Sequence, residues 1–330
     1  MSFALAARLV QAVSATPAGS TSLIALDGPE DLDTVCAWCA ATGNTVLAVH
    51  PDGVEVYRGR PADPVAALPP ERRPGHRLWV YTNFHCNLAC DYCCVSSSPR
   101  AAPRTLPTAE LSELVDAAIA AGVRELYLTG GEPFLLADLD ERLRIATAAL
   151  PTTVLTNGTV WHGERRRRLA CLPRERLTLQ ISLDSVTPEL HDRHRGPGSH
   201  RRACEGIALA RGLGFRVRVA ATLGADAGDE EQRLATLFDE LGLGSDERVV
   251  RRVARQGAAN AGLMVSRASL LPEVCVTAEG VWWHPVAATD PTMRVGDDWR
   301  PLTGVIGAIT EELRSHRLRG DVLASSFPCA

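Results

Sequence analysis

The stretch that decides the fold runs from Leu78 to Cys93 and reads LWVYTNFHCNLACDYC. Its beginning, Leu78–Thr82, predicts a strand, and three cysteines follow at C-x3-C-x2-C spacing: Cys86, Cys90 and Cys93. Thiolates are soft ligands that suit iron–sulfur clusters, and a short loop can wrap three of them around one cuboidal cluster. Three ligands for four irons would leave one iron without a protein ligand. An open coordination position distinguishes a reactive metal centre from a structural one.

The same loop has two plainer interpretations, a zinc site or three buried free cysteines. Zinc normally takes four ligands, and the fourth would have to be Cys94 or His85. Cys94 directly follows Cys93, so the two sulfurs would reach one ion only with difficulty. The iron–sulfur interpretation is therefore favoured.

Beyond this loop, predicted strands alternate with amphipathic stretches. The predicted strands are Leu78–Thr82, Glu125–Thr129, Thr153–Thr156, Thr178–Leu183, Arg216–Ala221 and Arg248–Val253. The predicted helices lie within Thr108–Ala121, Asp138–Ala149, Glu164–Cys171, Arg201–Leu213 and Glu230–Leu241. Such repeats predict a parallel sheet with helical crossovers. Six strands are too few for a closed eight-stranded barrel, so we predict an α/β fold with a partial (β/α)6 barrel and its chemistry at the C-terminal ends of the strands.

The pattern divides the chain into four predicted segments. Residues 1–60 form a small α/β domain, and residues 61–76 form a linker rich in proline and arginine. The partial barrel occupies residues 77–255. Residues 256–330 form an extension in which a hairpin precedes a final helix.

The second predicted barrel strand ends in Gly130-Gly131-Glu132-Pro133. Glycines at the end of a strand let a ligand approach the backbone closely, and a carboxylate there can accept hydrogen bonds from an ammonium group. By itself this tetrapeptide would be an ordinary turn. Its place one strand–helix unit after the cysteine loop makes the two motifs a joint signal.

Together these motifs resemble those of the radical S-adenosylmethionine (SAM) superfamily, and Tyr92 stands at the family's aromatic position before the third cysteine. The resemblance implies that Cys86, Cys90 and Cys93 hold a [4Fe–4S] cluster whose open iron binds the amino and carboxylate groups of SAM. One electron then cleaves the sulfonium, and the resulting 5′-deoxyadenosyl radical takes a hydrogen atom from a substrate. The Gly-Gly-Glu-Pro motif would hold the amino group of SAM. An electron donor such as a flavodoxin or a ferredoxin is also implied.

Further positions resemble residues that line the SAM pocket in this family. Asn157 and Ser182 end the third and fourth predicted strands, although polar residues there could equally satisfy the strand ends. Arg195 lies in a segment similar to the family's HD-x-x-RG motif, where its guanidinium could pair with the SAM carboxylate through two hydrogen bonds. A metal site made of His191, His194 and His200 is the weaker alternative.

The composition excludes several kinds of protein. All 35 basic residues are arginine, which excludes a Walker A phosphate loop and lysine Schiff-base chemistry, because both need a lysine. The net charge of -4 gives no reason to expect nucleic acid or an anionic membrane as partner. No apolar run is long enough to span a membrane, and the ten cysteines are not spaced like a secreted disulfide framework. We therefore expect a cytoplasmic protein.

The two ends of the chain carry weaker resemblances. Residues 18–59 are similar to part of the TusA-like sulfur-carrier fold but lack its Cys-Pro motif. In that region Cys36 and Cys39 could be a redox pair, although two buried apolar residues are the favoured interpretation. The hairpin around Cys275 resembles the beginning of an auxiliary-cluster (SPASM or Twitch) domain. Only Cys329 follows it, so a complete second cluster is not expected unless Cys171 or Cys204 contributes from the barrel.

Cys275 has two interpretations. Its thiol could return a hydrogen atom to a substrate radical across the barrel mouth, or it could be a buried structural cysteine.

The sequence therefore favours a radical SAM enzyme that acts on a small metabolite or natural product by epimerisation, dehydration, dehydrogenation or rearrangement. The alternatives are an enzyme that modifies a peptide or protein, and a non-enzymatic iron–sulfur scaffold or sensor.

Overall fold

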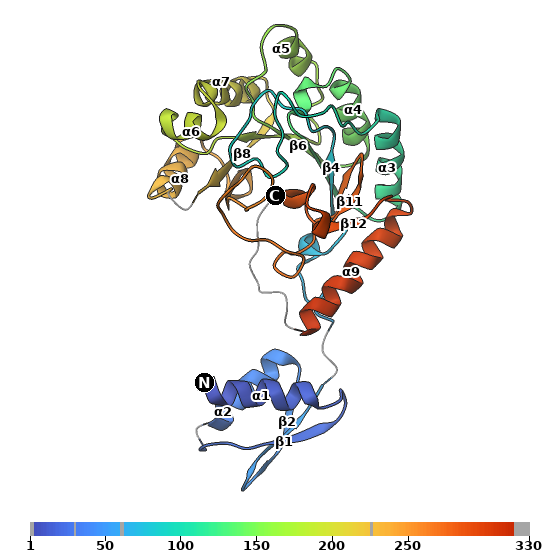
Figure 1. Ribbon diagram of the computed structural model, residues 1–330, viewed down its shortest axis with the longest axis vertical. Coiled ribbons are helices and arrows are strands. Elements are labelled where there is room, and N and C mark those ends of the chain that lie inside the picture. The colour runs from blue at the N-terminus through green and yellow to red at the C-terminus, as the bar shows by residue number, and fades with distance from the viewer. Residues whose placement is uncertain (1–2, 30, 60–62, 225–226, 320–330) are drawn as a thin grey trace. The chain divides into compact units, whose positions relative to one another are not determined.

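The computed structural model describes residues 3–29, 31–59, 63–224 and 227–319 (Figure 1). The chain divides into two compact units, Met1–Pro69 and Pro70–Ala330. The boundary between them falls within residues 61–76, for which the sequence predicts a linker.

The first unit packs two helices on a three-stranded antiparallel sheet. The helices are α1 (Phe3–Ala15) and α2 (Asp31–Thr42), and the strands are β1 (Thr21–Ile24), β2 (Thr45–His50) and β3 (Gly53–Tyr57), in the order β1-β3-β2. In α1, Leu5, Leu9 and Val13 recur every four residues and form a buried stripe, because residues at this spacing share one face of a helix. Val54 and Val56 of β3 belong to the same core. The similarity of this unit to a sulfur-carrier fold stays a prediction.

The second unit is built on a nine-stranded sheet. Six of its strands pair in parallel and in chain order: β4 (Arg77–Tyr81), β5 (Glu125–Thr129), β6 (Thr152–Thr156), β7 (Leu177–Ser182), β8 (Arg216–Leu223) and β9 (Arg248–Arg252). This arrangement confirms the predicted partial barrel.

Helices connect these strands and lie around the outside of the sheet (Figure 1). They are α3 (Thr108–Ala120), α4 (Leu139–Ala149), α5 (Gly163–Ala170), α6 (Pro188–Arg195), α7 (Ser199–Gly212) and α8 (Glu230–Glu240). The pattern of α3 shows why: Leu111, Leu114, Val115 and Ala118 are all buried, at the spacing of one helix face. The short helix α6 is the one element of this set that the sequence did not predict.

The C-terminal extension enlarges the barrel sheet. Strands β10 (Cys275–Thr277) and β11 (Gly280–Trp282) form the predicted hairpin, and β12 (Arg294–Gly296) pairs with β11. β10 also pairs in parallel with β4, which the sequence did not predict. A long final helix, α9 (Leu302–Arg319), follows. In the described residues, no helix combines the length and the apolarity needed to cross a membrane.

Candidate active site

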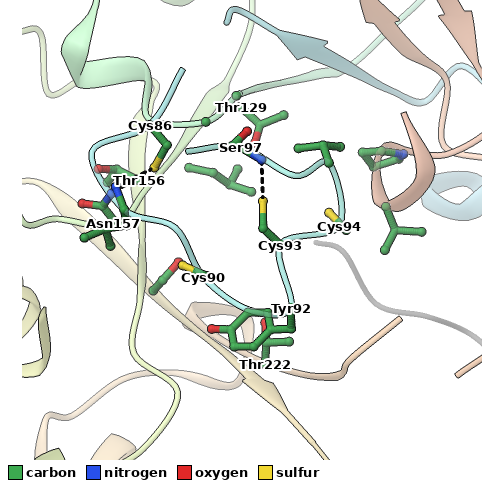
Figure 2. Close-up of a pocket in the computed structure, with 18 of the residues that line it drawn as sticks. Cys86, Cys90, Tyr92, Cys93, Cys94, Ser97, Thr129, Thr156, Asn157 and Thr222 are labelled. Carbon is green, nitrogen blue, oxygen red and sulfur yellow. Dashed lines mark hydrogen bonds between the residues drawn. The ribbon is translucent and has the colours of Figure 1, made fainter. Parts of the chain in front are cut away.

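A cavity of about 180 Å³ lies at the C-terminal ends of the parallel strands. The loop after β4 curves around it and contributes Cys86, Cys90, Tyr92 and Cys93 to its lining (Figure 2). β4 itself, the ends of β5 to β9, Arg195 of α6 and a segment after β11 also contribute to the lining. Because the C-terminal ends of parallel strands meet at one edge of the sheet, residues far apart in the chain converge here.

Two of the three cysteine sulfurs in the loop accept hydrogen bonds from backbone N–H groups. The backbone N–H of Leu88 donates to Cys86 Sγ at 3.4 Å, and that of Ser97 donates to Cys93 Sγ at 3.2 Å. Burial raises the pKa of Cys86 to about 12 and that of Cys90 to about 11. Thiols at these positions would stay protonated at neutral pH unless a metal centre offset the charge of the thiolates, because metal binding releases the thiol proton. The donor set therefore fits a buried metal centre with thiolate ligands.

A single zinc ion is the alternative occupant of this loop. A zinc ion draws its ligands into one tight tetrahedron, with sulfurs at about 2.3 Å from the metal. Across the described residues, no group of three His, Cys, Asp or Glu side chains is arranged to hold a single metal ion. The structure therefore gives no support to the zinc interpretation or to a site made of His191, His194 and His200. Three thiols around a shared cavity fit a cuboidal cluster better.

Gly130 and Gly131 line the cavity and also pack against the backbone that leads into the cysteine loop. A Cβ atom on Gly131 would lie 2.2 Å from the carbonyl oxygen of His85, and one on Gly130 would lie 2.2 Å from Asn83 Oδ1. The N–H of Gly131 donates to Asn83 O at 3.0 Å. The glycines are therefore needed for the packing of β5 on the loop, in addition to the close approach of a ligand that the sequence predicts.

Glu132 lies elsewhere than expected. Its side chain is fully buried and is not among the groups that line the cavity. Its carboxylate accepts hydrogen bonds from Phe134 N at 3.0 Å, Thr156 Oγ1 at 2.8 Å and Asn157 N at 2.8 Å. Burial raises its pKa to about 7 despite these donors. In this structure Glu132 joins the end of β5 to the end of β6, and its carboxylate is not free to meet a bound ammonium group.

Pro133 is buried and begins the 3₁₀ turn Pro133–Leu135. It shapes the backbone after the glycines, and it does not line the cavity either.

Arg195 and Tyr92 meet a carboxylate of the chain itself. The guanidinium of Arg195 donates through Nε and Nη2 to the two carboxylate oxygens of Asp184, and the Nη2 distance is 3.1 Å. Tyr92 donates its hydroxyl to the same carboxylate, and its ring lies 5.6 Å from the guanidinium carbon. Burial would raise the pKa of Asp184, but the charge of Arg195 outweighs it and holds that pKa below its ordinary value. The two-point partner that we expected for Arg195 in SAM is therefore Asp184 in this structure.

Asp184 is the site residue that sequence reasoning missed. It lies two residues after the end of β7, and its Oδ1 also accepts a hydrogen bond from Thr222 N at 2.9 Å. A carboxylate at the C-terminal end of a central strand was the available signal. It was not used because its partner, Arg195, lies on the unpredicted helix α6.

Replacing Asp184 with asparagine is expected to lower the free energy of unfolding of this unit by about 3–5 kcal/mol. The change would leave the buried Arg195 charge without its counter-ion, which is the costly way to break a buried ion pair. Urea unfolding of the variant and the parent measures the difference. The matched control is Asp246→Asn, which breaks the exposed pair of Asp246 with Arg216 and should cost under about 1 kcal/mol. Equal losses in both variants would contradict this account.

Two further residues that the sequence assigns to the SAM pocket, Asn157 and Ser182, remain to be placed. Both line the cavity. The side-chain amide of Asn157 donates to Asn87 Oδ1 at 2.9 Å and approaches Cys86 Sγ at 3.8 Å. The Ser182 hydroxyl has no hydrogen-bond partner among the described residues.

The structure does not support Cys275 as a hydrogen-atom donor. The residue is fully buried on β10, in register with Trp79 of β4, and does not line the cavity. A thiol must touch a substrate radical to donate to it, so the buried structural interpretation fits this position.

The other cysteines are scattered. Cys171 is exposed and Cys204 is half-buried, and neither reaches the cavity, so they supply no ligands for a second cluster there. Cys36 is exposed while Cys39 is buried, and neither is in a disulfide. Cys329 lies outside the described residues. Cys94, by contrast, lines the cavity.

Comparison with known proteins agrees with this geometry. Residues 80–239 match the sequence model of the Radical SAM superfamily. An AdoMet-dependent heme synthase of Oleidesulfovibrio alaskensis is 33% identical over 157 residues, which are 46% of this chain and 40% of that protein. The antilisterial bacteriocin subtilosin biosynthesis protein AlbA of Bacillus subtilis is 35% identical over 149 residues, 44% of this chain and 33% of its own length. The chain thus spans less than half the length of these two relatives.

Two further proteins match over more of the chain. A GTP 3′,8-cyclase of Parasynechococcus marenigrum is 29% identical over 297 residues, which are 81% of this chain and 84% of that protein. Among solved structures, native anSMEcpe with bound AdoMet aligns with a TM-score of 0.53 and 13% identity over 73% of this chain and 82% of its own. This likeness shows the shared fold.

The fold is a partial α/β barrel whose candidate active site lies at the C-terminal ends of the strands. Residues 80–239 carry a domain of the radical SAM superfamily, whose members use a [4Fe–4S] cluster and SAM. Enzymes of this superfamily also need an electron donor.

Proposed function

We propose that Cys86, Cys90 and Cys93 ligate the [4Fe–4S] cluster and that SAM lies against Gly130 and Gly131. The observation that supports this most is that the three thiols and the two glycines line one cavity. Asn157 and Ser182, which line the same cavity, would contact SAM beside the glycines. When bound, the cluster and SAM supply a one-electron cleavage of the sulfonium and the abstraction of a hydrogen atom from the substrate.

The chain itself orients these groups and excludes water. Leu88, Val95 and Val286 line the cavity, and each is less than 9% exposed, so its walls are largely apolar. The N–H donors of Leu88 and Ser97 stabilise negative charge on the sulfurs of Cys86 and Cys93. A dry site of this kind protects a reactive radical from side reactions.

The electron donor would approach the outer side of the cysteine loop. Ala89 and Asp91, which flank Cys90 in the chain, are both exposed. The surface therefore comes within one residue of a proposed cluster ligand, which suits a small carrier such as a flavodoxin or a ferredoxin.

For the substrate, we propose a small metabolite or natural product that undergoes epimerisation, dehydration, dehydrogenation or rearrangement. A relative that aligns over 81% of this chain and 84% of its own length is named as a GTP 3′,8-cyclase. The second candidate is a peptide or protein substrate, because another relative is a bacteriocin biosynthesis protein and anSMEcpe is also known with a bound peptide. A non-enzymatic scaffold is set aside, since the similar proteins are named as synthases and cyclases.

Formation of 5′-deoxyadenosine tests this proposal. The protein is purified without oxygen, its cluster is rebuilt, and SAM and dithionite are added. We expect 5′-deoxyadenosine well above the level without protein, and deuterium transfer into it from the correct labelled substrate. A protein that carries the full cluster but neither binds nor cleaves SAM would contradict the proposal.

A further inference from the structure

One arginine of the cavity has no acidic partner in the part of the chain that the structure describes. Arg251, on β9, is half-buried and lines the cavity beside Thr222 of β8. Its Nε donates to Thr222 Oγ1 at 3.0 Å. The described residues offer it no ion pair, and none of those that line the cavity is an aspartate or a glutamate. Arg251 therefore brings a positive charge to the cavity wall that no acidic side chain of the described residues neutralises.

The other two arginines of the cavity behave differently. Arg195 is paired with Asp184, and Arg252 donates to Glu231 at 2.7 Å. Outside the cavity, the buried Arg142 is likewise paired, with Asp138. Removing a charged group from water is costly unless a counter-charge meets it. Among the three arginines that line the cavity, Arg251 is thus the one without an ion pair in the described part of the chain, and a ligand is the natural source of its partner.

The surroundings of Arg251 suit a ligand with one charged end. Ala254, Pro285 and Val286 line the cavity together with it and offer mainly apolar surface. The planar guanidinium matches the geometry of a carboxylate or a phosphate, which it can bind through two parallel hydrogen bonds. Nε is occupied by Thr222, so the two Nη atoms remain for such an anion.

Arg251 and the proposed SAM contacts come from different strands. Those contacts come from the ends of β5, β6 and β7, whereas Arg251 lies on β9, at the edge of the parallel set. We propose that Arg251 binds an anionic group of the substrate, a carboxylate or a phosphate. This inference rests on the proposed function and adds the substrate class: a molecule with an anionic end and an apolar body.

Calorimetric titration of small anions into the holoenzyme tests the inference without turnover. Inorganic phosphate and succinate are titrated separately, at low ionic strength, into cluster-loaded protein saturated with SAM. The variants are Arg251→Gln, Arg251→Lys and the matched control Arg252→Gln. We expect at least one anion to bind the parent and to bind Arg251→Gln about tenfold or more weakly, as for a lost hydrogen bond to a charged group. Arg252→Gln should match the parent, because Glu231 already neutralises Arg252.

Arg251→Lys keeps the charge but loses the planar fork, so it should retain part of the affinity. The preferred anion, phosphate or succinate, would identify the group on the substrate. The SAM affinity of each variant is measured in parallel and should be unchanged.

Three results would overturn the inference. They are equal anion affinity in Arg251→Gln and the parent, no binding of either anion to the parent, and a loss of SAM affinity in Arg251→Gln, which would assign Arg251 to SAM. Failure of the parent itself to bind SAM would instead contradict the proposed function.

Discussion

Replacing Cys86, Cys90 or Cys93 with alanine is expected to reduce SAM cleavage to background and to remove most of the iron. Each cysteine contributes a thiol to the same cavity. A variant that lacks one of them has only two protein ligands for the cluster instead of three. The measurements are iron and sulfide per chain after anaerobic reconstitution, and 5′-deoxyadenosine after addition of SAM and dithionite.

Cys171→Ala is the matched control for this series. Cys171 is exposed at the end of α5 and does not line the cavity, so iron content and SAM cleavage should equal those of the parent. Cys94→Ala is a second comparison, because Cys94 lines the cavity but is not a proposed ligand. Its iron content should stay near that of the parent. If Cys94→Ala lost its iron while Cys93→Ala kept it, the proposed ligand set would be wrong.

Replacing Gly131 with alanine should prevent normal assembly of the site although no ligand is removed. The new methyl carbon would lie 2.2 Å from His85 O and 2.9 Å from Phe84 O, and a backbone atom cannot rotate away as a side chain can. Overpacking of this kind typically costs about 1–3 kcal/mol. Because the displaced backbone leads directly into Cys86, we expect a lower urea midpoint together with a loss of iron.

Gly212→Ala is the control for this substitution. Gly212 ends α7, and a Cβ atom there would meet nothing within 4 Å. Alanine is favoured over glycine in helices by up to about 1 kcal/mol, so this variant should be as stable as the parent or slightly more stable. Full iron content and an unchanged urea midpoint in Gly131→Ala would show that the close contact of β5 with the loop is not needed.

The sequence predicted the barrel because its signals are local. Each of the first five parallel strands is followed, before the next strand, by a stretch with the spacing of a helix face, and α3 illustrates this with Leu111, Leu114, Val115 and Ala118. The addition of β10 beside β4 could not be predicted in the same way. That pairing joins residues almost 200 positions apart, and a three-residue strand carries no pattern that identifies its neighbour.

The sequence predicted where the cavity lies, but it did not predict which charged side chains around it pair with one another. The cysteine spacing and the two glycines placed the site at the ends of the first two barrel strands, where the structure has the cavity. Sequence reasoning assigned Glu132 and Arg195 to SAM because a charged residue near a strand end suggests a ligand contact. In the structure both are satisfied within the chain, Glu132 by three donors and Arg195 by Asp184. Which charges pair is decided by distances that the sequence does not contain.

Cys275 illustrates the same limit. Its hairpin was predicted, but whether the thiol would face the cavity depended on the register of β10 on β4. Cys275 pairs in register with Trp79, which lines the cavity, yet Cys275 itself is fully buried and does not line it.

Electron paramagnetic resonance of the reduced, cluster-loaded protein, recorded with and without SAM, tests the central claim most directly. If Cys86, Cys90 and Cys93 leave one iron open to SAM, the protein should carry about four irons per chain, in keeping with a cubane cluster. Its spectrum should also change on addition of SAM. Zinc in place of iron, or an iron signal that is the same with and without SAM, would contradict the account.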